Sequence, residues 1–177
     1  MSEIGFERKI GYSFLGLMAG NVVSLMMLVF ISALPLLNVL PEVRKIWNLD
    51  ISQALGLSVA IWIVSMLGWV VIGLPVVLLL SAEIAADFYW ITAALIGAVL
   101  GLLTMLLFYL ALNQGRLDNS TFRNPQAMLM TATFFSSAAL IAGVAFAVYC
   151  ALVQAALRKL AKKSGAPNGA PQSLPVA

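Results

Sequence analysis

Residues 73–90, GLPVVLLLSAEIAADFYW, interrupt a long apolar region with two carboxylates, Glu83 and Asp87, four positions apart. As a single helix, residues 51–112 would extend over about 90 Å, three times the roughly 30 Å hydrocarbon core of a bilayer. The chain therefore has to turn within this region, and residues 81–87 form the polar stretch available for the turn. We expect Glu83 and Asp87 to lie in a tight turn between two membrane helices.

A second interpretation keeps the two acids inside the bilayer. On one continuous helix, Glu83 and Asp87 would share a face and hold two like charges together. Such an ionisable pair within a membrane usually marks a proton or ion path. The aromatic run Phe88-Tyr89-Trp90 that follows is typical of a membrane–water interface and favours the turn.

The composition of the whole chain supports a membrane location. Of its 177 residues, 62% are hydrophobic and 10% are charged, whereas an average soluble domain is about 45–50% apolar and about 25% charged. A chain of this length has too little interior to shield so much apolar surface from water. We therefore expect an all-α integral membrane protein, a bundle of four transmembrane helices.

Four apolar stretches are long enough to cross a bilayer, at about residues 12–34, 52–80, 88–112 and 125–157. Pro35 and Pro41 follow the first helix, and Pro75 predicts a kink late in the second. A short basic extension completes one domain over residues 1–163. The Gly- and Pro-rich residues 164–177 have no hydrophobic period and are expected to form a disordered tail.

Small residues recur at spacings of three and four in three of the predicted helices. Because lipid is as apolar as Leu, membrane helices associate by close packing at such residues. The stripes could meet within one chain or between chains, and we expect mainly the former. The predicted packing residues are Ser13, Gly16, Gly20, Ser24, Gly97, Gly101, Gly143 and Ala147.

The predicted helices contain no charged residue, and their main polar side chains are Asn21, Thr104, Ser136 and Ser137. These four could form interhelical hydrogen bonds or a polar path. The chain has no histidine and one cysteine, which excludes Ser-His and Cys-His nucleophile pairs and His-ligated metals. We predict no catalytic, cofactor-binding or metal-binding residue, and no enzymatic activity.

The basic residues lie at the edges of the apolar segments, where they fix membrane orientation rather than bind nucleic acid. Six fall on the side that holds both termini: Arg8, Lys9, Arg158, Lys159, Lys162 and Lys163. Four fall on the other side: Arg44, Lys45, Arg116 and Arg123. The positive-inside rule then predicts cytoplasmic termini in the cell membrane, a bacterial cytoplasmic membrane.

Two functions are compatible with these features. The absence of site chemistry and the small-residue faces favour a non-enzymatic accessory, assembly or scaffold subunit of a larger membrane complex, with the lipid bilayer and other membrane subunits or a second copy as partners. The alternative is a small transporter or channel-like protein for a neutral or weakly polar solute.

Overall fold

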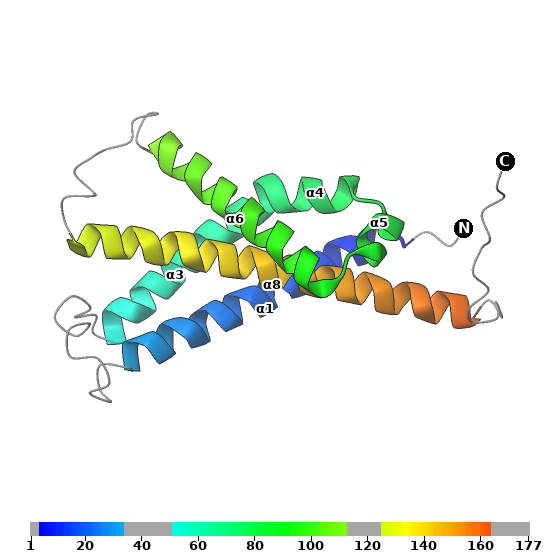
Figure 1. Ribbon diagram of the computed structural model, residues 1–177, viewed down its shortest axis with the longest axis horizontal. Helices are drawn as coiled ribbons and strands as arrows, with labels where there is room; N and C mark the ends of the chain where they lie inside the picture. Colours follow the sequence, from blue (N-terminus) through cyan, green and yellow to red (C-terminus); the bar gives the residue numbers. More distant parts are fainter. Residues whose placement is uncertain (1–3, 34–50, 113–124, 164–177) are drawn as a thin grey trace.

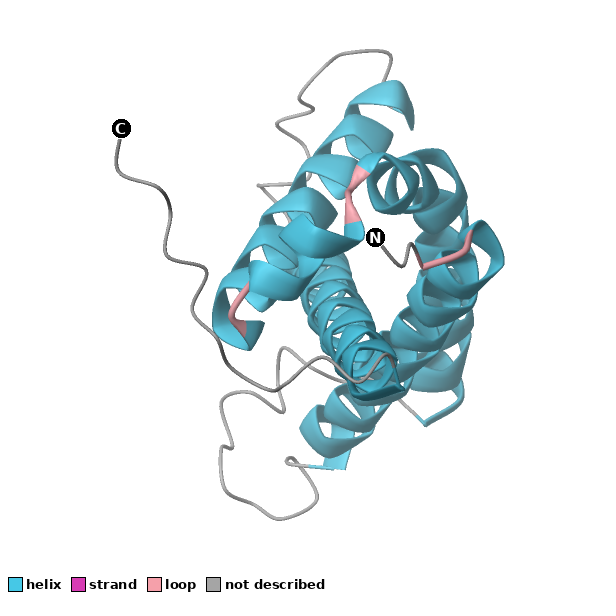
Figure 2. Ribbon diagram, turned by 90° about the vertical axis from the view of Figure 1, so that its right-hand side faces the viewer, coloured by secondary structure: helices cyan, strands magenta, loops and turns pink. Residues whose placement is uncertain are grey.

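The computed structural model describes residues 4–33, 51–112 and 125–163, and every element in these ranges is helical (Figures 1 and 2). The helices are α1 (Phe6–Ala33), α3 (Ile51–Gly68), η2 (Trp69–Gly73), α4 (Leu74–Leu79), α5 (Ala82–Asp87), α6 (Trp90–Leu112) and α8 (Pro125–Lys163). The expected all-α, four-helix membrane bundle is confirmed.

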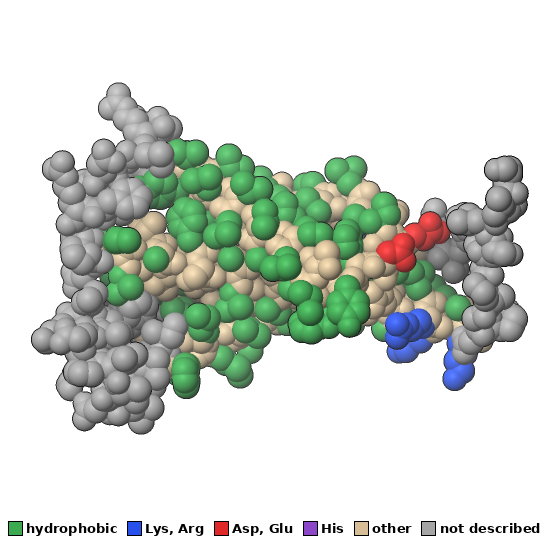
Figure 3. All heavy atoms as spheres, in the orientation of Figure 1, with side chains coloured by type: hydrophobic (Ala, Val, Ile, Leu, Met, Phe, Trp, Pro, Cys, Tyr) green, Lys and Arg blue, Asp and Glu red, His purple; other side chains and the backbone are tan. Residues whose placement is uncertain are grey.

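Four helical segments are long and apolar enough to cross a membrane: Phe6–Phe30, Leu55–Leu79, Trp90–Ala111 and Ala127–Lys162. The second crossing consists of α3, η2 and α4 in sequence. In the face shown in Figure 3, hydrophobic side chains cover the body, and the acidic and basic side chains gather at one end. The chain is thus a multi-pass membrane protein, and on this face its charged side chains lie at one end.

Two helices are longer than the hydrophobic pattern predicts. Helix α1 begins at Phe6 instead of near residue 12, and α8 continues through Arg158 and Lys159 to Lys163. In both regions the added residues include several basic side chains, which end a run of apolar residues but not a helix, because Lys and Arg are good helix formers. The predicted breaks at Pro35 and Pro41, the loop before Pro125 and the tail lie outside the described residues.

The second crossing is distorted just before Pro75. Residues Trp69–Gly73 form a π-helical turn, in which the amide of Leu74 donates to the carbonyl oxygen of Trp69. Pro75 has no amide proton to donate to the carbonyl four residues earlier, and its ring crowds that carbonyl. The predicted kink is therefore a local widening of the helix, which turns α3 relative to α4 without ending the crossing (Figure 1).

Helix α8 is the common packing partner of α1 and α6 and lies between them (Figure 1). Glycines make this possible. Gly16 and Gly20 of α1 face the backbones of Ala145 and Ile141, and a Cβ at Gly20 would lie 2.5 Å from the Ile141 carbonyl oxygen. No side chain fits at such a separation, so α1 and α8 approach to backbone contact.

The seam between α6 and α8 has the same construction. Gly97 and Gly101 face the backbones of Ala142 and Ala138. On α8, Gly143 makes the same kind of contact with α6: a Cβ at Gly143 would lie 2.9 Å from the Ala94 carbonyl oxygen. The glycines that the sequence predicts to pack are therefore used inside this chain, in two seams on one helix.

The first prediction concerns the α1–α8 seam. Gly20→Ala introduces a methyl group where the Ile141 carbonyl stands, and we expect the free energy of unfolding to fall by about 1–3 kcal/mol through overpacking. Gly56→Ala is the control, because nothing lies within 4 Å of a Cβ there and alanine favours a helix by about 1 kcal/mol over glycine. Reversible unfolding in bicelles measures both. Equal stability of the two variants would contradict the seam.

Candidate functional site

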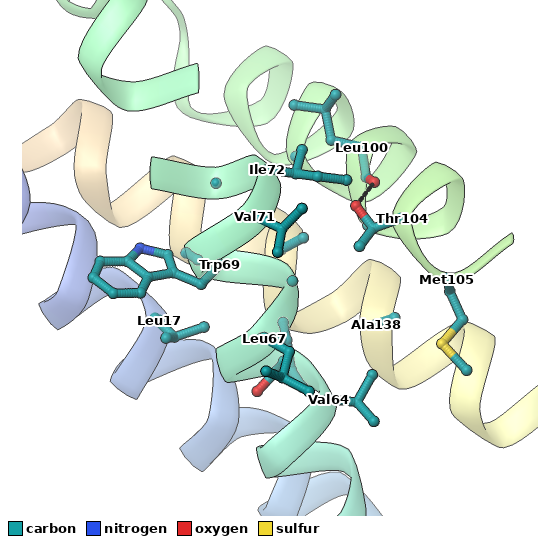
Figure 4. Close-up of a pocket in the computed structure, with 18 of the residues that line it drawn as sticks. Leu17, Val64, Leu67, Trp69, Val71, Ile72, Leu100, Thr104, Met105 and Ala138 are labelled. Atoms are coloured by element: carbon teal, nitrogen blue, oxygen red, sulfur yellow. Dashed lines mark hydrogen bonds between the residues drawn. The ribbon is translucent and has the colours of Figure 1, made fainter. Parts of the chain in front are cut away.

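A cavity of about 510 Å³ runs between the second crossing, α6, α8 and the start of α1. On α6 its lining extends from Gly97 to Ala111, about 21 Å along the helix axis. Side chains from α1, the second crossing, α6 and α8 converge on it in Figure 4, among them Leu17, Leu100 and Ala138. The lining is almost entirely apolar.

The polar residues predicted from the sequence do not form a path through this cavity. Of the four, Thr104 lines it, but its hydroxyl donates to the Leu100 carbonyl oxygen of its own helix at 2.7 Å (Figure 4). Ser136 is exposed and donates to the Thr133 carbonyl at 3.1 Å, while Ser137 is buried away from the cavity. Asn21 instead forms a hydrogen bond between α1 and α3.

Side-chain hydrogen bonds connect α1 to the second crossing and to Leu80, the residue that follows it. Asn21 accepts from the Ser65 hydroxyl at 3.0 Å, and the indole Nε1 of Trp69 donates to the Ser13 hydroxyl oxygen at 2.8 Å. Nearer the end of the bundle, the Lys9 Nζ donates to the Leu80 carbonyl oxygen at 3.0 Å. The second crossing is the least buried of the four, with 11% of its most apolar window buried against 22–39% in the others. Directional bonds thus supplement sparse packing there.

The remaining predicted packing residues lie inside the bundle. Ser24 is 3% exposed, and its hydroxyl has no hydrogen-bond partner among the described residues. Ala147 packs against the core cluster around Tyr149 and Val153. Ser13 is buried between helices and also accepts the hydrogen bond from the Trp69 indole.

Glu83 and Asp87 lie on α5, the short helix between the second and third crossings, and both are exposed. Figure 3 shows the acidic side chains at the charged end of the molecule, beyond the apolar band. The connection is not the predicted tight turn but a short helix that packs against the bundle. Its residue Ala85 is completely buried in the core cluster that contains Tyr149. The two acids occupy its outward face.

Side chains from the bundle and from the connection itself hold α5 in place. Ser81 caps its first turn by accepting from the Ile84 amide at 3.2 Å. At its other end, the Gln154 amide donates to the carbonyl oxygens of Ala86 and Phe88 at 2.7 and 3.0 Å. These bonds satisfy helix-end carbonyls that face the bundle instead of water.

Sequence reasoning missed three contributors: Trp69, Lys9 and Tyr149. Trp69 had a usable signal, since an indole donor in mid-helix needs a partner in hydrocarbon. For Lys9, the sequence indicates only a residue that fixes the membrane orientation. Tyr149 is 1% exposed and lines the cavity, yet its hydroxyl has no hydrogen-bond partner in the described part of the chain.

The described residues include no group of three or more His, Cys, Asp or Glu side chains placed to hold a metal ion. Comparison of the chain with family models, with curated proteins and with solved structures finds no match. Fold and site together define a class: an all-α, multi-pass membrane protein with an apolar intramembrane cavity.

The second prediction tests the bond between Trp69 and Ser13. Trp69→Phe and Ser13→Ala should each destabilise the bundle. Their double-mutant cycle should give a coupling of about 0.5–1.5 kcal/mol, the range of a net hydrogen bond in a membrane. Unfolding in bicelles provides the free energies.

Trp62→Phe is the matched control, because Trp62 faces outward with 46% of its surface exposed. Combined with Ser13→Ala, it should show no coupling. A coupling near zero for Trp69 as well would mean that the two side chains do not interact.

Proposed function

We propose that this chain is a non-enzymatic subunit of a larger membrane complex and that it joins its partners through the second crossing. The supporting observation is the outward stripe Leu55, Val59, Trp62 and Ile63, each about half exposed on the least buried crossing. Trp62 is the distinctive member. Its indole makes no hydrogen bond within the described part of the chain, although an N–H group in hydrocarbon is stabilised by a partner.

The use of the glycine faces also favours the second crossing. Gly16, Gly20, Gly97 and Gly101 already pack on α8 of the same chain, so these faces are occupied and a partner has to use another surface. A tryptophan on an apolar stripe fits an interface, because Trp contributes disproportionately to the binding energy of protein contacts. A partner helix with a hydrogen-bond acceptor opposite Trp62 would supply both packing and the missing bond.

Transport of a neutral or weakly polar solute is the alternative. The cavity favours it by running along much of the bundle. Its lining weighs against it, since the Thr104 hydroxyl donates to a carbonyl oxygen of its own helix at 2.7 Å and the Ser65 hydroxyl donates to Asn21 at 3.0 Å. A polar solute would meet few free hydrogen-bonding groups there.

The third prediction tests the subunit proposal by site-specific photocrosslinking in intact membranes. A photoreactive amino acid at Val59, on the outward stripe, should give discrete protein adducts that mass spectrometry identifies reproducibly. Trp62→Ala should weaken them, because truncating an interface tryptophan costs about 2 kcal/mol or more.

The same amino acid at Val99 is the control, since Val99 is 56% exposed on α6 away from the second crossing. It should give lipid adducts alone. Protein adducts at neither position, together with a lone monomer after gentle extraction, would reject the subunit proposal and favour the transporter.

We further propose that both termini and α5 face the cytoplasm of a bacterial cell. The basic residues of α1 and α8 support this orientation through the positive-inside rule. The fourth prediction is that Glu83→Cys in inverted membrane vesicles reacts with a membrane-impermeant maleimide, because Glu83 is exposed on α5.

Ala85→Cys should stay unreactive from either side, since Ala85 is completely buried, and the native Cys150 is buried as well. Asn119→Cys, in the predicted loop of the opposite side, should react only in right-side-out preparations. The reverse pattern at positions 83 and 119 would invert the orientation.

A further inference from the structure

The apolar cavity is open toward the lipid as well as extended along the bundle. Leu67 and Val71 of the second crossing and Leu107 of α6 all line it, yet their side chains are 53%, 70% and 60% exposed. Residues that belong both to the lining and to the outer surface mark an entrance. The entrance therefore lies between the second crossing and α6, at the depth of the hydrocarbon.

The entrance is too narrow to admit a helix. The second crossing and α6 touch beside it, where a Cβ at Gly68 would lie 3.1 Å from Cγ2 of Thr104. A helix is about 10 Å across with its side chains and could not pass where Gly68 and the Thr104 methyl group lie against each other. A single hydrocarbon chain is thin and flexible enough to enter on either side of the contact.

The lining selects an apolar occupant. The Thr104 hydroxyl donates to a carbonyl oxygen of its own helix, the Ser65 hydroxyl is bonded to Asn21, and the Trp69 indole is bonded to Ser13. A polar solute would lose its hydration without gaining replacement bonds along this surface. A hydrocarbon chain loses nothing, and the volume of about 510 Å³ lies within the roughly 300–1,000 Å³ of ligand pockets in general.

Tyr149 provides one polar group at the end of the cavity nearest α5. It lines the cavity together with Phe146 and Val77, it is 1% exposed, and its hydroxyl is buried without a hydrogen-bond partner among the described residues. A buried donor left unbonded is costly. The hydroxyl has almost no accessible surface, so an oxygen atom on the occupant would satisfy it once a neighbouring side chain of the lining moves aside.

From these observations we propose that the cavity binds one acyl chain of a membrane lipid, which enters laterally between the second crossing and α6 and has its ester oxygen near the Tyr149 hydroxyl. This lipid site does not depend on the subunit proposal, because the cavity faces α6 and α8 whereas the stripe around Trp62 faces outward.

The fifth prediction uses the full chain in liposomes that contain phosphatidylcholine with a diazirine in one acyl chain. After irradiation, mass spectrometry should find lipid adducts on Ala138 and Ala142, which line the cavity, as well as on Leu95, which is 63% exposed on the outer face of α6. Absence of adducts on both alanines in the unaltered protein would overturn the site.

A matched pair of valines tests the location. Val64→Trp fills the cavity and should lower the adducts on Ala138 and Ala142 by about fivefold or more, with those on Leu95 unchanged, because a filled space admits no chain. Val99→Trp places the same ring on the lipid-facing side and should change neither. An equal effect of the two variants, or none of Val64→Trp, would refute lateral binding in the cavity.

The hydroxyl is tested separately by native mass spectrometry of the purified protein. Tyr149→Phe keeps the ring and should reduce the lipid retained after extraction by about fivefold, the equivalent of one hydrogen bond of about 1 kcal/mol. Tyr89→Phe, at an exposed position, should retain as much as the unaltered protein. Undiminished retention by Tyr149→Phe would show that the ester oxygen does not lie there.

Discussion

The bundle depends on backbone contact between α8 and its two neighbours. In hydrocarbon, burying a leucine against another helix gains little over leaving it in lipid, so helices associate mainly through close packing and polar bonds. Gly16 and Gly20 bring α1 to the backbone of α8, and Gly97 and Gly101 do the same for α6. With both seams on one helix, α1 and α6 are fixed relative to each other although they belong to opposite sides of α8.

The second crossing is held differently. It has no comparable glycine seam with α6, and it is attached to α1 through Lys9, Ser13 and Asn21 by side-chain hydrogen bonds. Pro75 and the π-helical turn before it alter its course. The apolar cavity follows from this arrangement: three helices are packed to backbone contact, while the fourth is held by a few bonds and by sparser side-chain packing, and leaves space between itself and α6 and α8.

The sequence contains most of the fold but little of the cavity. Hydrophobic length predicts four crossings, and the glycine spacings predict the faces that pack, because both depend on local pattern alone. The extent of α1 and α8 was underestimated, since a hydrophobic pattern locates the apolar part of a helix and not its polar ends. The sequence predicts a tight turn around Glu83. The structure has a short helix there instead, which the burial of Ala85 and the hydrogen bonds from Gln154 fix against the bundle. The hydrogen bonds from Gln154 join residues about 70 positions apart, and the residues that line the cavity are also far apart in the sequence. No local sequence pattern predicts either.

Helix α8 has 39 residues and a length of about 58 Å, nearly twice the thickness of a hydrocarbon core. Its basic end, with Arg158, Lys159 and Lys162, therefore extends well past the apolar band as part of the same unbroken rod. Because the helix is continuous, a force on this end would act directly on the part of α8 that carries both glycine seams and lines the cavity. The basic end and the element on which α1 and α6 are assembled are thus parts of one continuous helix.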